Sequence, residues 1–111
     1  MTDPTPAQPP RPITNGVIAL LTVKAGVTRD QVMSVMPTEI RETIQLYLNG
    51  KIREWYSRGD GRGVVLFLDA SDVAEAEAIL EELPLARERL MHHEYVAVGP
   101  ILPLQLLVAK P

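Results

Sequence analysis

General acid–base catalysis is the first chemistry that the residue types of this sequence suggest. It requires a base whose pKa lies near neutrality, and a positive group beside the base can hold an anionic substrate or intermediate. Arg53 can hold an oxyanion or a carboxylate, His93 titrates near neutral pH, and Glu54 becomes such a base when it is buried beside aromatic rings. We therefore take Arg53, Glu54 and His93 as candidate catalytic residues.

The strand expected over residues 51–57 decides which of these side chains can act together. Side chains alternate between the two faces of a strand, so Arg53 and Glu54 should face opposite ways unless the strand contains a bulge. Arg53 and His93 are thus the better catalytic pair within one subunit. An ion pair of Arg53 with a glutamate at a subunit interface is an equally good explanation of this arginine, and a plain surface position is the alternative for His93.

A metal or cofactor is not expected. His92 and His93 are adjacent in a strand pattern, so they should point to opposite faces and cannot easily share a metal ion. The absence of cysteine also excludes thiolate zinc sites.

Aromatic and methionine side chains near these positions can shape an apolar ligand pocket. Flexible methionines suit an irregular apolar ligand, whereas aromatic rings are more often part of a core or an interface. The candidate substrate-binding residues are Met33, Met36, Tyr47, Trp55 and Tyr56.

Length and composition exclude several other functions. The 111 residues suffice for one domain, and 46% hydrophobic with 23% charged residues is typical of a globular protein. A net charge of −3 disfavours nucleic acid as a partner, and no apolar run reaches the roughly 18 residues of a membrane span. Because the polar N-terminal residues lack the apolar stretch of a signal peptide, we expect a cytoplasmic protein that does not contact membranes.

Shifts in composition divide the chain into three parts. Residues 1–15 contain five of the ten prolines and should form an extended tail. Residues 16–102 carry the strand and helix patterns and form the domain. The apolar residues 103–111 form an extension suited to a sheet edge or an interface.

Periodicity within the domain predicts four strands and two helices. The expected strands cover residues 17–24, 51–57, 63–70 and 93–101, and the expected helices cover residues 29–48 and 73–83. Pro37 should break the first helix into two pieces with a kink, because proline removes a backbone donor and clashes with the preceding turn. The inward side of that helix should consist of Ile40, Ile44, Tyr47 and Leu48.

The order strand, helix, strand, strand, helix, strand predicts a ferredoxin-like α+β fold. In this βαββαβ arrangement, a four-stranded antiparallel sheet carries two helices on one face and leaves the other face bare. Residues 17–23 and 64–68 are apolar at positions that point to both faces, so the bare face needs a cover. A second copy of the chain is the simplest cover, and we expect a homodimer.

Four stretches of the domain resemble the muconolactone isomerase-like group within the dimeric α/β-barrel superfamily. The resemblance spans roughly residues 17–102. It is carried by Thr22-Val23-Lys24, by residues 50–56, by the strand at 64–69 with the helix start at 71–76, and by Leu83-Pro84-Leu85. Arg53 matches the family, whereas Glu54 and Tyr56 stand where its lactone isomerases carry histidine and tryptophan.

The resemblance implies a fold and a type of activity. In the family, two such domains press their sheets together into a barrel, and members act without cofactors on small cyclic or aromatic molecules. We therefore expect a cofactor-free isomerase that transfers a proton on a small cyclic carbonyl compound. Two alternatives stay open, a cofactor-free monooxygenase or cyclase of an aromatic or polyketide-like substrate, and a non-catalytic dimeric module for ligand binding or assembly.

Overall fold

The computed structural model describes residues 13–101. Residues 1–12 of the expected tail and all of the expected extension, residues 103–111, lie outside the described residues, so their proposed roles stay predictions. The described chain forms β1 (Gly16–Val23), α1 (Arg29–Leu48), β2 (Ile52–Ser57), β3 (Gly63–Leu68), α2 (Val73–Leu80), α3 (Pro84–Arg87) and β4 (Met91–Val98).

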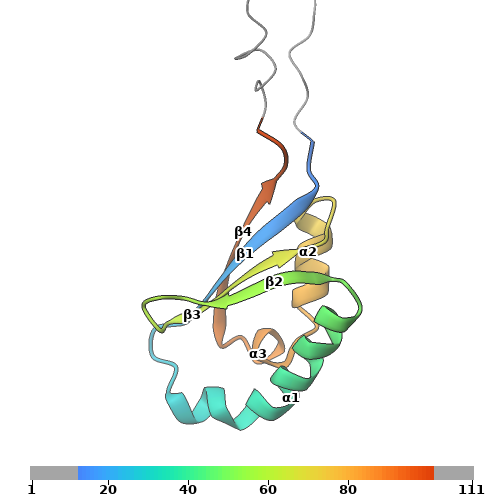
Figure 1. Cartoon of the computed structure of the whole chain (residues 1–111). Helices are drawn as coiled ribbons and strands as arrows, with labels where there is room; N and C mark the ends of the chain where they lie inside the picture. Colours follow the sequence, from blue (N-terminus) through green and yellow to red (C-terminus); the bar gives the residue numbers. More distant parts are fainter. Residues whose placement is uncertain (1–12, 102–111) are drawn as a thin grey trace, which may run out of the picture.

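The four strands form one antiparallel sheet in the order β2-β3-β1-β4. The helices lie together on one side of this sheet (Figure 1), so the predicted ferredoxin-like α+β fold is confirmed. A third, short helix was not expected. α2 ends at Leu80 rather than at Leu83, and Pro84 begins α3, because its fixed φ and missing N–H suit the first position of a helix.

The core lies between the sheet and the helices. The helix-facing residues of the two central strands are buried there, except Val23 and Val64, which are partly buried. The neighbours that point to the open face of the sheet, such as Ile18, Leu20, Val65 and Phe67, are only half-buried. The fully or nearly buried residues of the sheet are Val17, Ala19, Leu21, Ile52, Leu66, Leu68 and Met91.

Local signals at both ends of α1 set the bounds of this helix. Thr28 caps the helix, its hydroxyl accepting a 3.2 Å hydrogen bond from the backbone N–H of Gln31, whose side chain bonds back to Thr28. At the other end, Gly50 adopts the left-handed conformation with φ 79°, which glycine reaches without strain.

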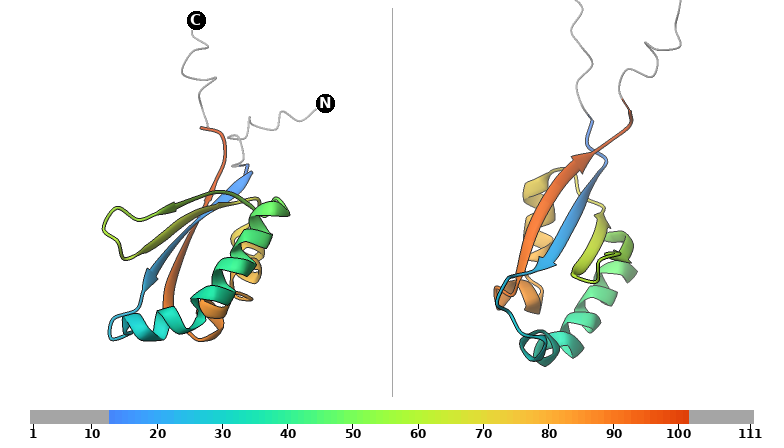
Figure 2. Two further views of the ribbon diagram at one scale, coloured as in Figure 1. Left: turned by 60° about the horizontal axis from the view of Figure 1, so that its bottom comes forward. Right: turned by 90° about the vertical axis from the view of Figure 1, so that its left-hand side faces the viewer.

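The expected division of α1 into two helices is wrong. One helix runs from Arg29 to Leu48 with Pro37 inside it. The ribbon still changes direction between its first and second halves (Figures 1 and 2). A proline inside a helix removes one hydrogen bond and bends the axis, and here the neighbouring turns keep their helical conformation through the bend.

The expected inward side of α1 is wrong in part. Ile40 and Ile44 line the space between the helix and the sheet but stay exposed, Tyr47 and Leu48 are exposed outside that space, and Glu39 is buried. The cause is the position of the helix, which packs chiefly against α3 and β2 instead of lying flat over the middle of the sheet. The inward stripe of α1 therefore includes Glu39, and a space remains between the helix and the central strands.

Within residues 13–101, no helix has the length and apolar character needed to cross a membrane.

Candidate functional site

An apolar pocket of about 600 Å³ lies between α1 and the sheet. This volume is in the range of pockets that hold small organic molecules. Its walls come from α1, from the helix-facing side of β1, β2 and β3, and from the residues around α3. Most of the side chains that line it are apolar, among them Val32, Met36, Ile44, Leu21, Val64 and Leu66.

Glu39 is the buried acid in the wall of this pocket. Only 8% of its surface is exposed. Its Oε1 accepts a 2.9 Å hydrogen bond from the backbone N–H of Leu85. Its Oε2 lies 3.5 Å from the hydroxyl of Thr43, whose shorter bond of 2.7 Å goes to the backbone carbonyl of Glu39. One carboxyl oxygen is thus anchored, and the other keeps most of its hydrogen-bonding capacity.

Burial changes the acidity of Glu39. Loss of water around the carboxylate raises the pKa of Glu39 above its ordinary value of 4.5, and the hydrogen bonds from Leu85 and Thr43 oppose part of that rise. A carboxyl group with a raised pKa in an apolar pocket is suited to take up and return a proton.

Glu39 also has a structural role. Leu83, the residue before α3, has an apolar side chain and makes no side-chain cap. The carboxylate of Glu39 reaches across from α1 and accepts from an N–H in the first turn of α3. This contact joins the two helices and holds Glu39 in one orientation.

Sequence reasoning missed Glu39, although a signal was present. The residues of α1 at the spacing of one helical face, Val32, Val35, Met36, Glu39, Thr43 and Leu46, are all partly or fully buried. Glu39 is the one charged residue among them. A charge within an otherwise apolar or neutral stripe indicates a buried ionisable group, and the more apolar stripe through Ile40 and Ile44 concealed it.

Only some of the predicted aromatic and methionine residues line the apolar pocket. Met36, Trp55 and Tyr56 line the apolar pocket, whereas Met33 and Tyr47 are not among its lining residues. Tyr47 contributes indirectly, because its ring stacks on Trp55 with the ring centres 4.9 Å apart and the planes 6° from parallel. This stacked pair joins the end of α1 to β2 beside the pocket.

β2 contains a bulge that changes which residues share a face. Ile52 pairs with Leu68, and Glu54 pairs with the next residue, Phe67, so Arg53 is the extra residue. The expected alternation, with Ile52 and Glu54 on one face, is therefore wrong. After the bulge, Glu54 shares the open face with its partner Phe67.

Arg53 belongs to the open face of the sheet and not to the pocket. Its guanidinium lies 4.9 Å above the ring of Phe67. It donates hydrogen bonds to Asp69, at 2.6 Å, and to the backbone carbonyl of Asn15, at 2.7 Å. Arg53 thus forms an ion pair with an aspartate of its own chain, whereas a glutamate at a subunit interface was the expected partner.

Glu54 is exposed rather than buried beside aromatic rings. Its carboxylate accepts a 2.8 Å hydrogen bond from the hydroxyl of Tyr56, which is exposed as well. The same bond raises the pKa of Tyr56. The burial on which the candidate catalytic role of Glu54 depended is therefore absent.

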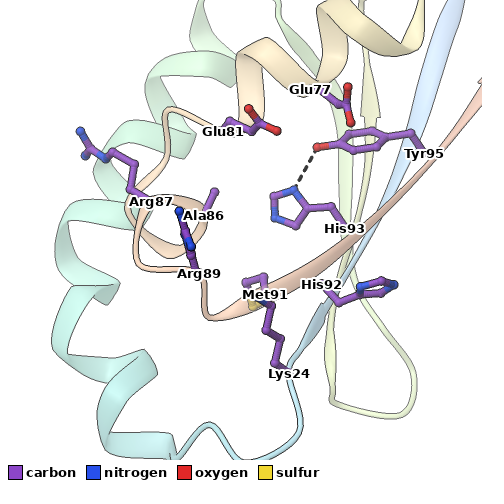
Figure 3. A pocket seen from close by; sticks show the side chains of 10 residues that line it. All are labelled: Lys24, Glu77, Glu81, Ala86, Arg87, Arg89, Met91, His92, His93 and Tyr95. Atoms are coloured by element: carbon purple, nitrogen blue, oxygen red, sulfur yellow. Dashed lines mark hydrogen bonds between the residues drawn. The ribbon is translucent and has the colours of Figure 1, made fainter.

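His93 lies in a second pocket, of about 570 Å³ (Figure 3). It pairs with Leu21 of β1 and faces the helices, and its Nδ1 lies 2.9 Å from the hydroxyl of Tyr95. Because β2 and β4 are the two edge strands, the structure does not bring Arg53 and His93 together. Arg53, Glu54 and His93 all lie outside the lining of the apolar pocket.

Among residues 13–101, no three histidine, aspartate or glutamate side chains are grouped closely enough to hold a metal ion. The polar side chains that line the apolar pocket include Glu39, Thr43, Tyr56, Ser57 and Arg62.

Comparisons with known proteins found no matching protein-family model and no matching curated protein.

Proposed function

We propose that the protein is a cofactor-free isomerase that binds a small hydrophobic carbonyl compound between α1 and the sheet and moves a proton between two of its carbon atoms. The observation that carries this proposal is Glu39, a buried carboxyl group with a raised pKa in the wall of an apolar pocket of about 600 Å³. The resemblance to the muconolactone isomerase-like group supports the same class of reaction.

In this proposal, Glu39 is the base and then the acid. Its carboxylate removes a proton from the carbon beside the carbonyl group, and the C–H electrons form an enolate. The same carboxyl group returns the proton to another carbon of the conjugated system, which restores the carboxylate and leaves an isomer of the substrate. The reaction is neutral in protons and electrons, so no cofactor or oxidant is consumed.

The enolate oxygen needs a donor on the opposite side of the pocket. Ser57, at the end of β2, and Arg62, in the β2–β3 hairpin, line the pocket and carry suitable groups. Met36 and Trp55 supply apolar surface around the ring of the substrate. We assign Arg53, Glu54 and His93 no step in this reaction, since they lie outside this pocket.

A hydrogen–deuterium exchange experiment tests the proposal. Unsaturated five-membered lactones and cyclic enones are incubated with the protein in D₂O, and NMR follows the exchange of the C–H groups beside the carbonyl. We expect the protein to catalyse this exchange and Glu39→Gln to slow it by about 10²- to 10⁴-fold. Glu82→Gln, which changes an exposed acid outside the pocket, should leave the rate unchanged.

A second function is favoured by the contact between Glu39 and Leu85. If the carboxylate serves only to join α1 to α3, the protein is a non-catalytic module that binds a small apolar molecule. Saturable binding of a lactone or enone without any exchange above the buffer rate would establish the module and overturn the isomerase. Equal exchange rates for the wild type and Glu39→Gln would remove Glu39 from the mechanism.

A further inference from the structure

The second pocket carries charges of both signs and shares only Met91 with the lining of the proposed isomerase site. It is formed by α2, by the turn between α3 and β4, by the start of β4 and by the end of β1. Lys24, Arg87 and Arg89 contribute positive charge, and Glu77 and Glu81 contribute negative charge. In Figure 3 the two carboxylates lie on the α2 side, with Lys24 and Arg89 on the other side and His93 between them.

Arg89 occupies a backbone position at which glycine is preferred. The N–H of Arg89 bonds to the carbonyl of Ala86 and the N–H of Leu90 to that of Leu85, which is the hydrogen-bond pattern of a Schellman motif at the end of α3. The left-handed residue of that motif is Arg89, with φ 59°. Within residues 13–101 it is the one residue other than glycine with a positive φ.

The backbone alone does not explain an arginine at this position. A residue with a Cβ is strained in the left-handed conformation, and such residues are concentrated at functional sites. Among the described residues, neither Arg89 nor Lys24 forms an ion pair, whereas Arg87 lies 3.9 Å from Glu42. The guanidinium of Arg89 is therefore available in the pocket to an anion.

The other pocket residues complete a site that has one positively charged side and one negatively charged side. His93 is half-buried, and the bond of its Nδ1 with Tyr95 leaves Nε2 as its second polar atom. Glu77 of α2 and Glu81, the C-cap residue of this helix, lie four residues apart and on the same side. A molecule with one negative and one positive group complements both walls, whereas a simple anion would meet the two carboxylates unfavourably.

We propose that this pocket is a binding site for a small zwitterionic ligand of the amino acid type. Its carboxylate binds Arg89 and Lys24, and its ammonium group binds Glu81 and Glu77. The site does not depend on the isomerase activity proposed above, because its charged groups are not part of the apolar pocket.

Titration of the whole chain with straight-chain amino acids, from glycine to 6-aminohexanoate, tests the proposal. NMR shifts or calorimetry measure the binding, and the acid without the amine and the amine without the acid, of equal chain length, are the reference ligands. We expect at least one amino acid to bind saturably and about tenfold or more tightly than either reference ligand. Glu81→Gln should weaken the binding of the amino acid and leave the binding of the simple acid unchanged.

Substitution of Arg89 separates a ligand role from a structural one. Arg89→Gly should weaken the binding of the amino acid by about tenfold or more. The melting temperature should stay equal or rise, since glycine relieves the strained φ. Arg89→Asn also tolerates this conformation and serves as the second variant. Arg41→Gln, an exposed change on α1, should bind like the wild type.

Three results would overturn the proposal. They are the absence of saturable binding for every amino acid of the series, equally tight binding of the simple acid, and undiminished binding by both Arg89 variants.

Discussion

At the scale of single residues, Glu39 has the most unusual surroundings in the described chain. Its pKa is raised by burial, so the folded protein holds a proton there more tightly than the unfolded chain does. The stabilisation is fully present below the ordinary value of 4.5 and is lost as the pH rises through the folded value. At neutral pH the buried carboxylate therefore reduces the free energy of unfolding.

We expect Glu39→Gln to be more stable than the wild type at pH 7. The glutamine oxygen can still accept the hydrogen bond from Leu85, and the cost of burying a charge disappears. The advantage should shrink as the pH falls through the raised pKa of Glu39, and it should be smallest below about 4.5. Urea unfolding at a series of pH values measures it, and an advantage that grows toward acid pH would contradict our assignment of the pKa shift.

His93 makes the stability depend on pH in the direction opposite to that of Glu39. Burial lowers the pKa of His93 below its ordinary value of 6.5, while Glu81 and Glu77 oppose this shift and His92 and Lys24 add to it. The unfolded chain then binds a proton more readily than the folded protein. The stabilisation is present above pH 6.5 and is lost as the pH falls through the folded value.

We expect His93→Gln to lose less stability than the wild type between pH 7 and pH 5, because glutamine does not titrate in this range. Melting temperatures across these pH values provide the measurement, and the His92→Gln variant, which changes the exposed neighbour, is the control. Identical pH profiles for His93→Gln and the wild type would exclude the buried histidine as the cause.

At the scale of secondary-structure elements, the pairing of β1 with β3 depends on a close approach at Gly63. This glycine pairs with Thr22, and a Cβ added to it would collide with the backbone carbonyl of Leu21. The collision involves backbone, which cannot move aside as the end of a flexible side chain can. The sheet therefore requires glycine at the first residue of β3.

We expect Gly63→Ala to lower the free energy of unfolding by about 1–3 kcal/mol, the usual cost of overpacking a well-packed site. Gly59→Ala, in the same hairpin, meets no atom within 4 Å and should change it by less than about 0.5 kcal/mol. Chemical denaturation of the two variants measures both values. Equal effects would show that the hairpin and not the strand contact sets the cost.

At the scale of the whole molecule, the open face of the sheet has the composition of an interface. Ile18, Leu20, Val65 and Phe67 are half-buried there, and Val96, which pairs with Ile18, is 50% exposed. The helices cover only the opposite face (Figure 2). We propose that a second copy of the chain covers this face, as the resemblance to the dimeric α/β-barrel superfamily implies.

We expect the wild type to be a dimer at micromolar concentration and Val96→Lys to be a folded monomer, because burying an unpaired ammonium group in the interface is unfavourable. Light scattering gives the mass, and circular dichroism checks the fold. Gln45→Lys places the same charge on an exposed position of α1 and should leave the dimer intact. A monomeric wild type would exclude this interface.

The sequence by itself determined the order of the four strands and of α1 and α2, the antiparallel sheet and the ends of α1. These features depend on local signals, namely the alternation of apolar residues, the Thr28 cap, Gly50 and the glycine-rich hairpin. Each of these acts within a few residues along the chain, so it can be read without knowledge of distant contacts.

The tertiary structure decided which residues form the candidate site. Because of the bulge, Arg53 and Glu54 both lie on the open face, and the position of α1 buries Glu39 while Ile40 lines an open pocket. Both depend on contacts between residues far apart in the sequence, with Phe67 and Asp69 for Arg53 and with Leu85 for Glu39. Periodicity predicts that a helix or strand has a buried face, but packing against distant elements decides which face that is.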